Sequence, residues 1–411
     1  MVKEFFIVIF SNIFSQLIAF GGTIVYARLL DIKQFGLYSF SYSIISFFLL
    51  FNGFGAASGI LQYVSKANNQ ENKLGYLRFS FKLGILFNSC LSIIIFIYAI
   101  LTPMPIISSK YILCEMALFP IGRLYIDVTL SYFRATQQNH TLSKFSIFSN
   151  SIIFIFNFLG IYIAKLHGFI VSTYISYIFI FIVSPSLFKI PHIFSISNKV
   201  TLPIKHSEFI KYSLYITISN AFSQLLFVFD IIVLGYIVKN TNVIAQYKVA
   251  TIIPFAINFI PGIIISFFYP LFAKNANNKN YILNLKTAIQ KKMFFFSFMI
   301  SLFLILTAKY IITFLFGNNY HDSIIPFQIL SFGFWIVSTF RIINSNILAS
   351  IGKAKFSMWF NMFMMIINII LTVCLIKKFG IIGSAISVVS MYIISSVITS
   401  FILKTFLKSH F

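Results

Sequence analysis

Residues 212–238 read YSLYITISNAFSQLLFVFDIIVLGYIV, an almost entirely uncharged and mostly apolar run that contains one carboxylate, Asp230. About twenty apolar residues are enough for an α-helix to cross a membrane. A charged side chain inside such a helix costs a few kcal/mol, so it usually has a function or a partner. The run therefore predicts a membrane-spanning helix with a candidate functional residue inside it.

The same pattern occurs near the start of the chain. Residues 219–225 read SNAFSQL and residues 11–17 read SNIFSQL, while Gly22 stands where the second copy has Asp230. Further pairs repeat at a similar spacing: Lys144-Phe145-Ser146 with Lys355-Phe356-Ser357, Asn150 with Asn361, Asn157 with Asn368, and His167-Gly168 with Phe379-Gly380. We interpret the chain as two related halves, only the second of which keeps the carboxylate.

Composition places the chain among polytopic membrane proteins. Hydrophobic residues make up 59% of it, charged residues 9%, and the mean hydropathy is +0.93. The net charge is +23. Because the basic residues cluster between apolar runs, they indicate membrane topology and anionic lipid headgroups rather than a nucleic-acid partner.

Twelve apolar runs have spanning length, and each predicted half holds six of them. The first half is 1–188, a connector with Pro191 and Pro203 follows at 189–211, and the second half is 212–411. An even number of spans per half predicts a parallel repeat, whose axis lies along the membrane normal, with a cavity where the halves meet. The runs are Phe5–Tyr26, Leu37–Leu61, Phe79–Leu101, Tyr111–Phe133, Phe145–Ala164, Gly168–Phe188, Tyr212–Val238, Val243–Phe272, Met293–Phe316, Ser323–Ser350, Phe356–Ile376 and Gly380–Leu403.

The charges of the connectors predict the orientation. Twelve spans put both termini on one side, and the connectors of that side carry most of the Lys and Arg residues, for example Lys286, Lys291 and Lys292. The positive-inside rule then places both termini in the cytoplasm and Asn318 outside. The apolar run that starts at Phe5 shows no clear small-residue cleavage site, so we expect a retained first helix.

Four segments resemble the polysaccharide transporter family of the multidrug/oligosaccharidyl-lipid/polysaccharide exporter superfamily. They are YARLLDIKQFGLY at 26–38, DIIVLG at 230–235, FLFGNNY at 314–320 and KKFGIIGSA at 377–385, together with Asn368. The resemblance covers essentially the whole chain. It implies an all-α protein of two six-helix bundles in the bacterial inner membrane, similar in size to the O-antigen flippases. Such flippases move undecaprenyl-pyrophosphate-linked oligosaccharides, as in lipopolysaccharide biosynthesis.

Five charged residues lie well inside the spans, and they are the candidate site residues: Glu115, Arg123, Asp127, Asp230 and Arg341. Arg123 and Asp127 are four residues apart and share one helix face, which indicates an internal ion pair, a transport role, or both. Glu115 lies about 120° around the same helix from Asp127. Asp127, Asp230 and Glu115 are candidates for coupling to a proton or a sodium ion, whereas a purely structural hydrogen bond is the alternative for Asp230.

Arg341 has no acidic residue near it in the sequence. A guanidinium matches phosphate oxygens in a two-pronged geometry, so Arg341 and Arg123 are the candidates for contact with the substrate pyrophosphate. An interhelical pair with a distant carboxylate is the alternative. We expect all these charges except Glu115 to line one water-accessible cavity. We interpret Asn157 and Asn368 as interhelical hydrogen-bonding residues rather than sugar contacts.

Enzyme chemistry is not indicated. Cys90, Cys114 and Cys374 lack metal-ligand or disulfide spacing, the six histidines lie in connectors or the tail, and no Gly-rich phosphate loop occurs. We therefore expect no cofactor and no metal. Two alternatives remain beside a flippase: a cation-coupled drug exporter of the same superfamily, and a membrane polysaccharide polymerase, which the short outer connectors disfavour.

Overall fold

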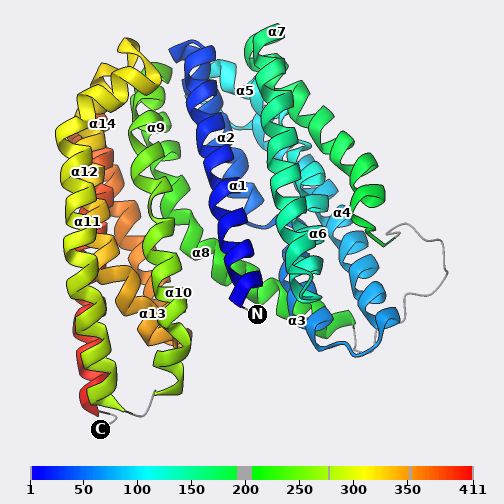
Figure 1. The fold of residues 1–411 in the computed structure, drawn as a ribbon. Helices are drawn as coiled ribbons and strands as arrows, with labels where there is room; N and C mark the ends of the chain where they lie inside the picture. The colour runs from blue at the N-terminus through cyan, green and yellow to red at the C-terminus, as the bar shows by residue number, and fades with distance from the viewer. Residues whose placement is uncertain (1, 192–205, 276–277, 351–353, 410–411) are drawn as a thin grey trace. The chain divides into compact units, whose positions relative to one another are not determined.

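The computed structural model describes residues 2–191, 206–275, 278–350 and 354–409, and every element in them is helical (Figure 1). Packing groups the chain into two compact units, 1–228 and 229–411. The helices of the first unit are α1 Val2–Leu29, α2 Ile32–Leu49, the 3-10 turn η1 Asn52–Gly55, α3 Ala56–Lys66, α4 Gln70–Leu101, α5 Ile107–Glu115, α6 Phe119–Ala135, α7 Asn139–Phe188 and the first part of α8 His206–Val238.

The second unit begins in the last part of α8. Its other helices are α9 Thr241–Ala256, α10 Phe259–Lys274, α11 Lys279–Phe316, the 3-10 turn η2 Asn318–Ser323, α12 Ile324–Ile336, the π-helix η3 Val337–Arg341, α13 Ile342–Ser350 and α14 Ala354–Ser409. Short polar side chains start two of the long helices: Asp31 Oδ1 accepts the Gln34 N–H before α2 at 2.7 Å, and Asn278 Oδ1 accepts the Tyr281 N–H before α11 at 3.0 Å.

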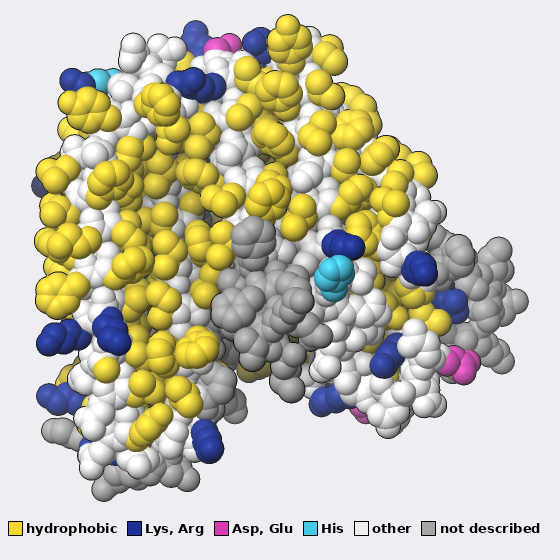
Figure 2. Space-filling model, viewed as in Figure 1, with side chains coloured by type: hydrophobic (Ala, Val, Ile, Leu, Met, Phe, Trp, Pro, Cys, Tyr) yellow, Lys and Arg dark blue, Asp and Glu magenta, His cyan; other side chains and the backbone are white. Residues whose placement is uncertain are grey.

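Each of the twelve predicted runs is occupied by helix, which confirms the all-α fold class. Seven helical stretches of the described chain are long and apolar enough to cross a membrane by themselves. Two of these seven stretches, α7 and α14, each join two predicted spans, whereas the run 111–133 is divided into α5 and α6. Hydrophobic side chains cover the middle of the helices and Lys and Arg gather toward their ends (Figure 2), the distribution of a membrane protein.

The second and fourth predicted spans of each half are interrupted. Span two breaks between α2 and α3, where Gly53, Phe54 and Gly55 have φ of 61°, 53° and 74°. Span four breaks between α5 and α6, span eight between α9 and α10, and span ten passes through the π-helix η3. A broken helix frees backbone groups that need new partners, and in membranes such breaks are found where backbone is buried in protein or lines a cavity.

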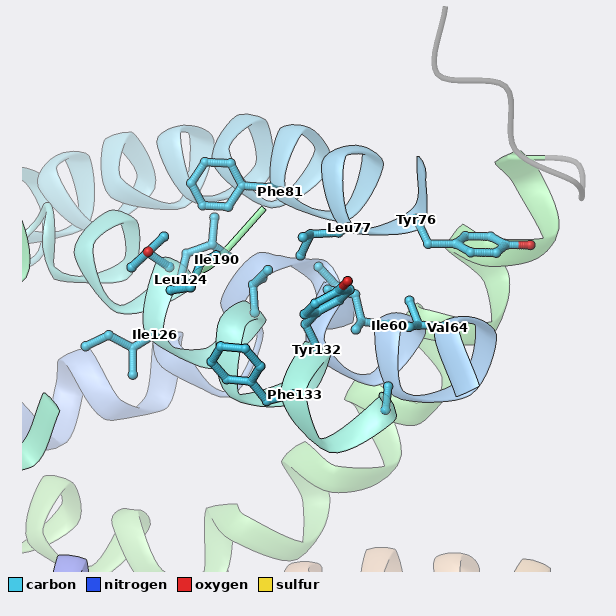
Figure 3. Close-up of a cluster of buried hydrophobic side chains, with 14 of the residues drawn as sticks. Ile60, Val64, Tyr76, Leu77, Phe81, Leu124, Ile126, Tyr132, Phe133 and Ile190 are labelled. Carbon is cyan, nitrogen blue, oxygen red and sulfur yellow. The ribbon is translucent and has the colours of Figure 1, made fainter. Parts of the chain in front are cut away.

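Aromatic packing explains why the start of α8 groups with the first unit. Phe209 is fully buried and its ring lies 5.4 Å from that of Tyr63 and 5.4 Å from that of Phe79. It joins a core built from α3, α4, α6 and α7, in which Ile60, Leu77, Tyr132 and Phe133 meet (Figure 3). The boundary between the units therefore falls inside α8. The predicted division at 189–211 stays a prediction, because residues 192–205 of that connector lie outside the described residues.

Two glycines, at the end of η1 and in α3, let α8 approach closely. A Cβ at Gly59 would collide with the Phe209 ring and the Ser213 hydroxyl, and a Cβ at Gly55 would collide with Thr217 and the Ser213 carbonyl. Close backbone approach at small residues is a main source of helix association in membranes.

We expect Gly59→Val to destabilise the protein by about 2–4 kcal/mol, because overpacking separates α8 from α3. The apparent melting temperature in detergent, followed by size-exclusion chromatography after heating, measures the effect. Gly21→Val in α1 is the matched control, since nothing lies within 4 Å of a Cβ there. Equal melting temperatures for the two variants would contradict this packing.

The two long hairpins show the repeat in atomic detail, although at a shifted register. In α7 the chain turns at Lys165, with φ 51° and ψ −128°, and in α14 it turns at Gly380, with φ 56° and ψ −127°. Gly168 packs on the Gly160 carbonyl as Gly383 packs on the Leu375 carbonyl. Gly168 therefore corresponds to Gly383, about one helical turn beyond the predicted partner Gly380.

Candidate functional site

A network of buried amides joins the two interrupted spans of the first unit. The Asn88 amide of α4 donates to the Pro120 carbonyl at the start of α6 (2.7 Å) and to Asn52 Oδ1 in η1 (2.6 Å). Asn88 Oδ1 in turn accepts the Gly53 N–H at 2.7 Å. Asn88 is fully buried. One side chain thus hydrogen-bonds backbone groups at both helix breaks.

The network ends on the predicted ion pair. The Asn52 amide donates to Asp127 Oδ2 at 2.8 Å, and Arg123 Nε lies 3.1 Å from Asp127 Oδ1. The side chains of Arg123 and Asp127 are 42% and 30% exposed, so this end of the network is open while Asn88 is closed. The guanidinium therefore has N–H groups free for a ligand beyond the single Nε bond that the structure shows.

Glu115 lies apart from this network. Its Oε2 is 3.0 Å from His167 Nδ1, near the hairpin turn of α7, and its backbone carbonyl accepts the Tyr174 hydroxyl. Both side chains of the pair are exposed, Glu115 by 38% and His167 by 68%. The break at Met116–Leu118 separates Glu115 from Arg123 and Asp127. In a continuous helix Glu115 would have lain about 120° around from Asp127.

Asp230 is buried in the second unit, with 2% of its surface exposed. Its Oδ1 accepts the Thr372 hydroxyl at 3.3 Å, and Thr372 also lies 3.3 Å from Ser387 Oγ in the second arm of α14. Asp230 Oδ2 makes no hydrogen bond of regular geometry to a described residue, although Tyr247 and Asn368 lie beside the carboxyl. A buried carboxylate with an incomplete set of donors is a place where a proton or a cation binds favourably.

Arg341 ends the π-helix, where the Ile342 N–H bonds back to the Val337 carbonyl. A π-helix rotates the following side chains relative to an α-helix and often marks a functional site. The guanidinium lies 5.9 Å from the centre of the Tyr392 ring, within the range of a cation–π contact. Among the described residues no Asp or Glu forms an ion pair with Arg341. Tyr392 lies within electrostatic range of both Arg341 and Asp230.

The structure therefore brings together some of the predicted residues. Arg123 pairs with Asp127 in the first unit, and Tyr392 lies near both Asp230 and Arg341 in the second. That these four line one cavity stays a prediction, because each pair belongs to a different unit. The predicted stripe of Ser219, Ser223 and Asp230 also stays a prediction, since the side chains of both serines lie outside the described residues.

Sequence reasoning missed the amides and hydroxyls that complete both clusters. The pair Asn52-Gly53 inside an apolar run is a turn signal that could have shown the break in span two. Asn88, Thr372 and Tyr392 carry no such signal, because one polar residue in a spanning helix can face any neighbour. The predicted interhelical role of Asn157 is supported by its acceptance of the Ser172 and Thr173 hydroxyls at 2.9 and 3.0 Å.

Comparison with solved structures shows which fold this is. A multidrug resistance MATE family transporter of the MOP superfamily, in an inward-facing conformation, is 12% identical, covers 96% of this chain and 95% of its own, and has a TM-score of 0.79. The lipid II flippase MurJ in an inward closed conformation is 17% identical, with coverages of 97% and 87% and a TM-score of 0.72. A MOP superfamily transporter from Pyrococcus furiosus, described as having a binding pocket of reverse polarity, has a TM-score of 0.60 at 13% identity, with coverages of 99% and 94%.

Comparison of sequences gives the family. An uncharacterized membrane protein of Methanocaldococcus jannaschii is 25% identical over 96% of this chain and 82% of its own length. Residues 1–276, more than half of the chain, match the family described as polysaccharide biosynthesis protein. This multi-pass membrane protein belongs to the polysaccharide biosynthesis protein family.

Proposed function

We propose that this protein is a flippase that moves a lipid-linked oligosaccharide, carried on undecaprenyl pyrophosphate, across the bacterial inner membrane. The observation that carries the proposal is the guanidinium of Arg341 inside an apolar span, without an acidic partner in the described chain. A cation so placed needs an anion, and a pyrophosphate supplies one with matching geometry. Membership of a polysaccharide biosynthesis family names the matching class of substrate.

In this proposal the two charge clusters have different roles. Arg341 and the open side of Arg123 bind the pyrophosphate, Asp127 holds Arg123 in place, and Asp230 binds the coupling proton or sodium ion. The broken spans allow each unit to change shape during alternating access. The pair of Glu115 and His167 takes no part in substrate binding, because it lies beyond the helix break. We place both termini in the cytoplasm, following the charge of the connectors.

Export of the surface polysaccharide tests the proposal. Arg341→Ala should lower export at least about tenfold at unchanged protein level, because a charge-assisted pair is worth about 1.5–3 kcal/mol. Arg341→Lys should restore only part of it, because an ammonium cannot form the two-pronged contact. The measurement is complementation of a deletion strain, with membrane abundance and the lipid-linked glycan accumulating inside determined alongside.

Arg134→Ala is the matched control, since Arg134 lies exposed in the last turn of α6. If the Arg341→Ala variant exported the polysaccharide like the wild type, Arg341 would not be part of a pyrophosphate site.

A drug exporter is the second candidate, and the structural match to a MATE transporter favours it. The two candidates make opposite predictions for a deletion strain. A drug exporter would leave the glycan unchanged and raise sensitivity to cationic dyes, whereas a flippase would stop glycan export.

A further inference from the structure

A groove of about 390 Å³ runs between α10 and α11, and its lining contains no residue of the two charge clusters. One wall is Ile264 and Phe268, one turn apart on α10, and the other is a stripe of α11 that contains Leu285, Ile289 and Phe296. Lys292 is the one charged residue in the lining, and its side chain is exposed. The groove is therefore an apolar channel with a single cation beside it.

The length of α11 places Lys292 at the membrane surface. The helix has 38 residues, about 57 Å at 1.5 Å per residue, whereas the apolar core of a bilayer is about 30 Å thick. Polar residues follow Phe316, so that end marks one interface. Lys292 is roughly 36 Å from Phe316 along the helix, which is the depth of the opposite headgroups. Phe296, which is 48% exposed, then lies on the bilayer side of Lys292, whereas Leu285 lies on its water side.

The charge around the groove is of one sign. Lys286 and Lys291 flank Lys292 on the same helix. The acidic residues of 229–411 are Asp230, which is buried with Thr372, and Asp322, which lies in η2 at the other end of α11. The ammonium of Lys292 thus has no carboxylate of its own unit to pair with, and an anion from outside is the complementary partner.

We propose that the groove binds an anionic phospholipid of the adjacent leaflet, with its phosphate on Lys292 and one acyl chain between α10 and α11. An acyl chain matches the apolar walls, which offer few hydrogen bonds to a peptide or a sugar. The proposal goes beyond the flippase function, because it assigns a bound lipid that is not the transported substrate. From a phosphate at Lys292 the bound chain would run into the bilayer and cover Phe296, which is 48% exposed.

Native mass spectrometry of the purified full chain tests this with phosphatidylglycerol and phosphatidylcholine of identical acyl chains. Lys292→Ala should weaken phosphatidylglycerol binding about fivefold and leave phosphatidylcholine binding unchanged, because one lysine near an anionic headgroup is worth about that factor. Lys291→Ala is the matched control: it removes the same charge from the neighbouring position, outside the groove lining. Lys291→Ala should weaken phosphatidylglycerol binding by less than half as much as Lys292→Ala does.

A second variant tests the acyl chain. Ala288→Phe fills the groove and should weaken both lipids about tenfold, with the apparent melting temperature showing that the variant is folded. The proposal is overturned if Lys291→Ala acts as strongly as Lys292→Ala, or if folded Ala288→Phe binds both lipids like the wild type. It is also overturned if millimolar inorganic phosphate displaces phosphatidylglycerol, because the site would then be one for free phosphate.

Discussion

Asp230→Asn is expected to lower glycan export at least about fivefold while the protein is made at its normal level, because coupling between two binding sites is typically worth about 5- to 150-fold in affinity. The reason is that an amide keeps the shape of the carboxyl but cannot take up a proton or balance a cation. The thermal stability of the protein should not fall with export. Removing a buried charge whose Oδ2 lacks a regular hydrogen bond should leave the apparent melting temperature unchanged or raise it.

Two measurements separate coupling from folding here: export in the complemented deletion strain, and thermal stability in detergent. Asp322→Asn is the control, because that carboxylate lies at the end of α11 and accepts one hydrogen bond from Gln246 at 2.9 Å. It should export normally. If Asp230→Asn exported like the wild type but melted at a lower temperature, Asp230 would be a structural hydrogen-bond acceptor for Thr372 and nothing more.

The apolar runs predicted the helices well, because burial in lipid needs a long apolar stretch whatever the local geometry. Hydropathy averages over about twenty residues, so it could not show that residues 50–55 and 116–118 interrupt two of these stretches. The breaks depend on a few residues, such as Gly53 and Gly55, and on distant partners such as Asn88. The repeat was visible in short matching segments of the sequence. The pairing of Gly168 with Gly380 was nevertheless wrong by about one helical turn, because Gly380 corresponds to Lys165.

The candidate site was predictable only where its partners are close in sequence. Arg123 and Asp127 are four residues apart, so helix geometry alone brings them together. Glu115 was predicted to lie about 120° around the same helix from Asp127, and the break before α6 leaves it with His167. Asn52, Asn88 and Asp127 are far apart in the chain, and Asp230 meets Thr372 across 142 residues. Contacts of this kind depend on how helices pack, which composition and periodicity do not determine.

Asn88→Leu is expected to destabilise the first unit more than any single change in its charged residues, by about 3–5 kcal/mol. Leucine has the same number and branching of side-chain heavy atoms, so the main loss is one of hydrogen bonds. The Gly53 N–H and Asn52 Oδ1 would lose a partner in one step, at about 1–3 kcal/mol for each unsatisfied buried group, and the Pro120 carbonyl would lose its side-chain donor. The apparent melting temperature and the monodisperse fraction after detergent extraction measure the loss.

Asn150→Leu is the matched control, because the Asn150 amide bonds only the Ser146 carbonyl one turn away, which the helix itself already satisfies. It should cost less than about 1 kcal/mol, since a group that keeps its helical partner pays no desolvation penalty. Asn88→Asp keeps the acceptor for Gly53 but turns a carboxylate oxygen toward two acceptors in a buried place, so it should be at least as unstable as Asn88→Leu. If Asn88→Leu and Asn150→Leu had the same apparent melting temperature, packing alone would hold the breaks in spans two and four. The amide network would then not be needed for stability.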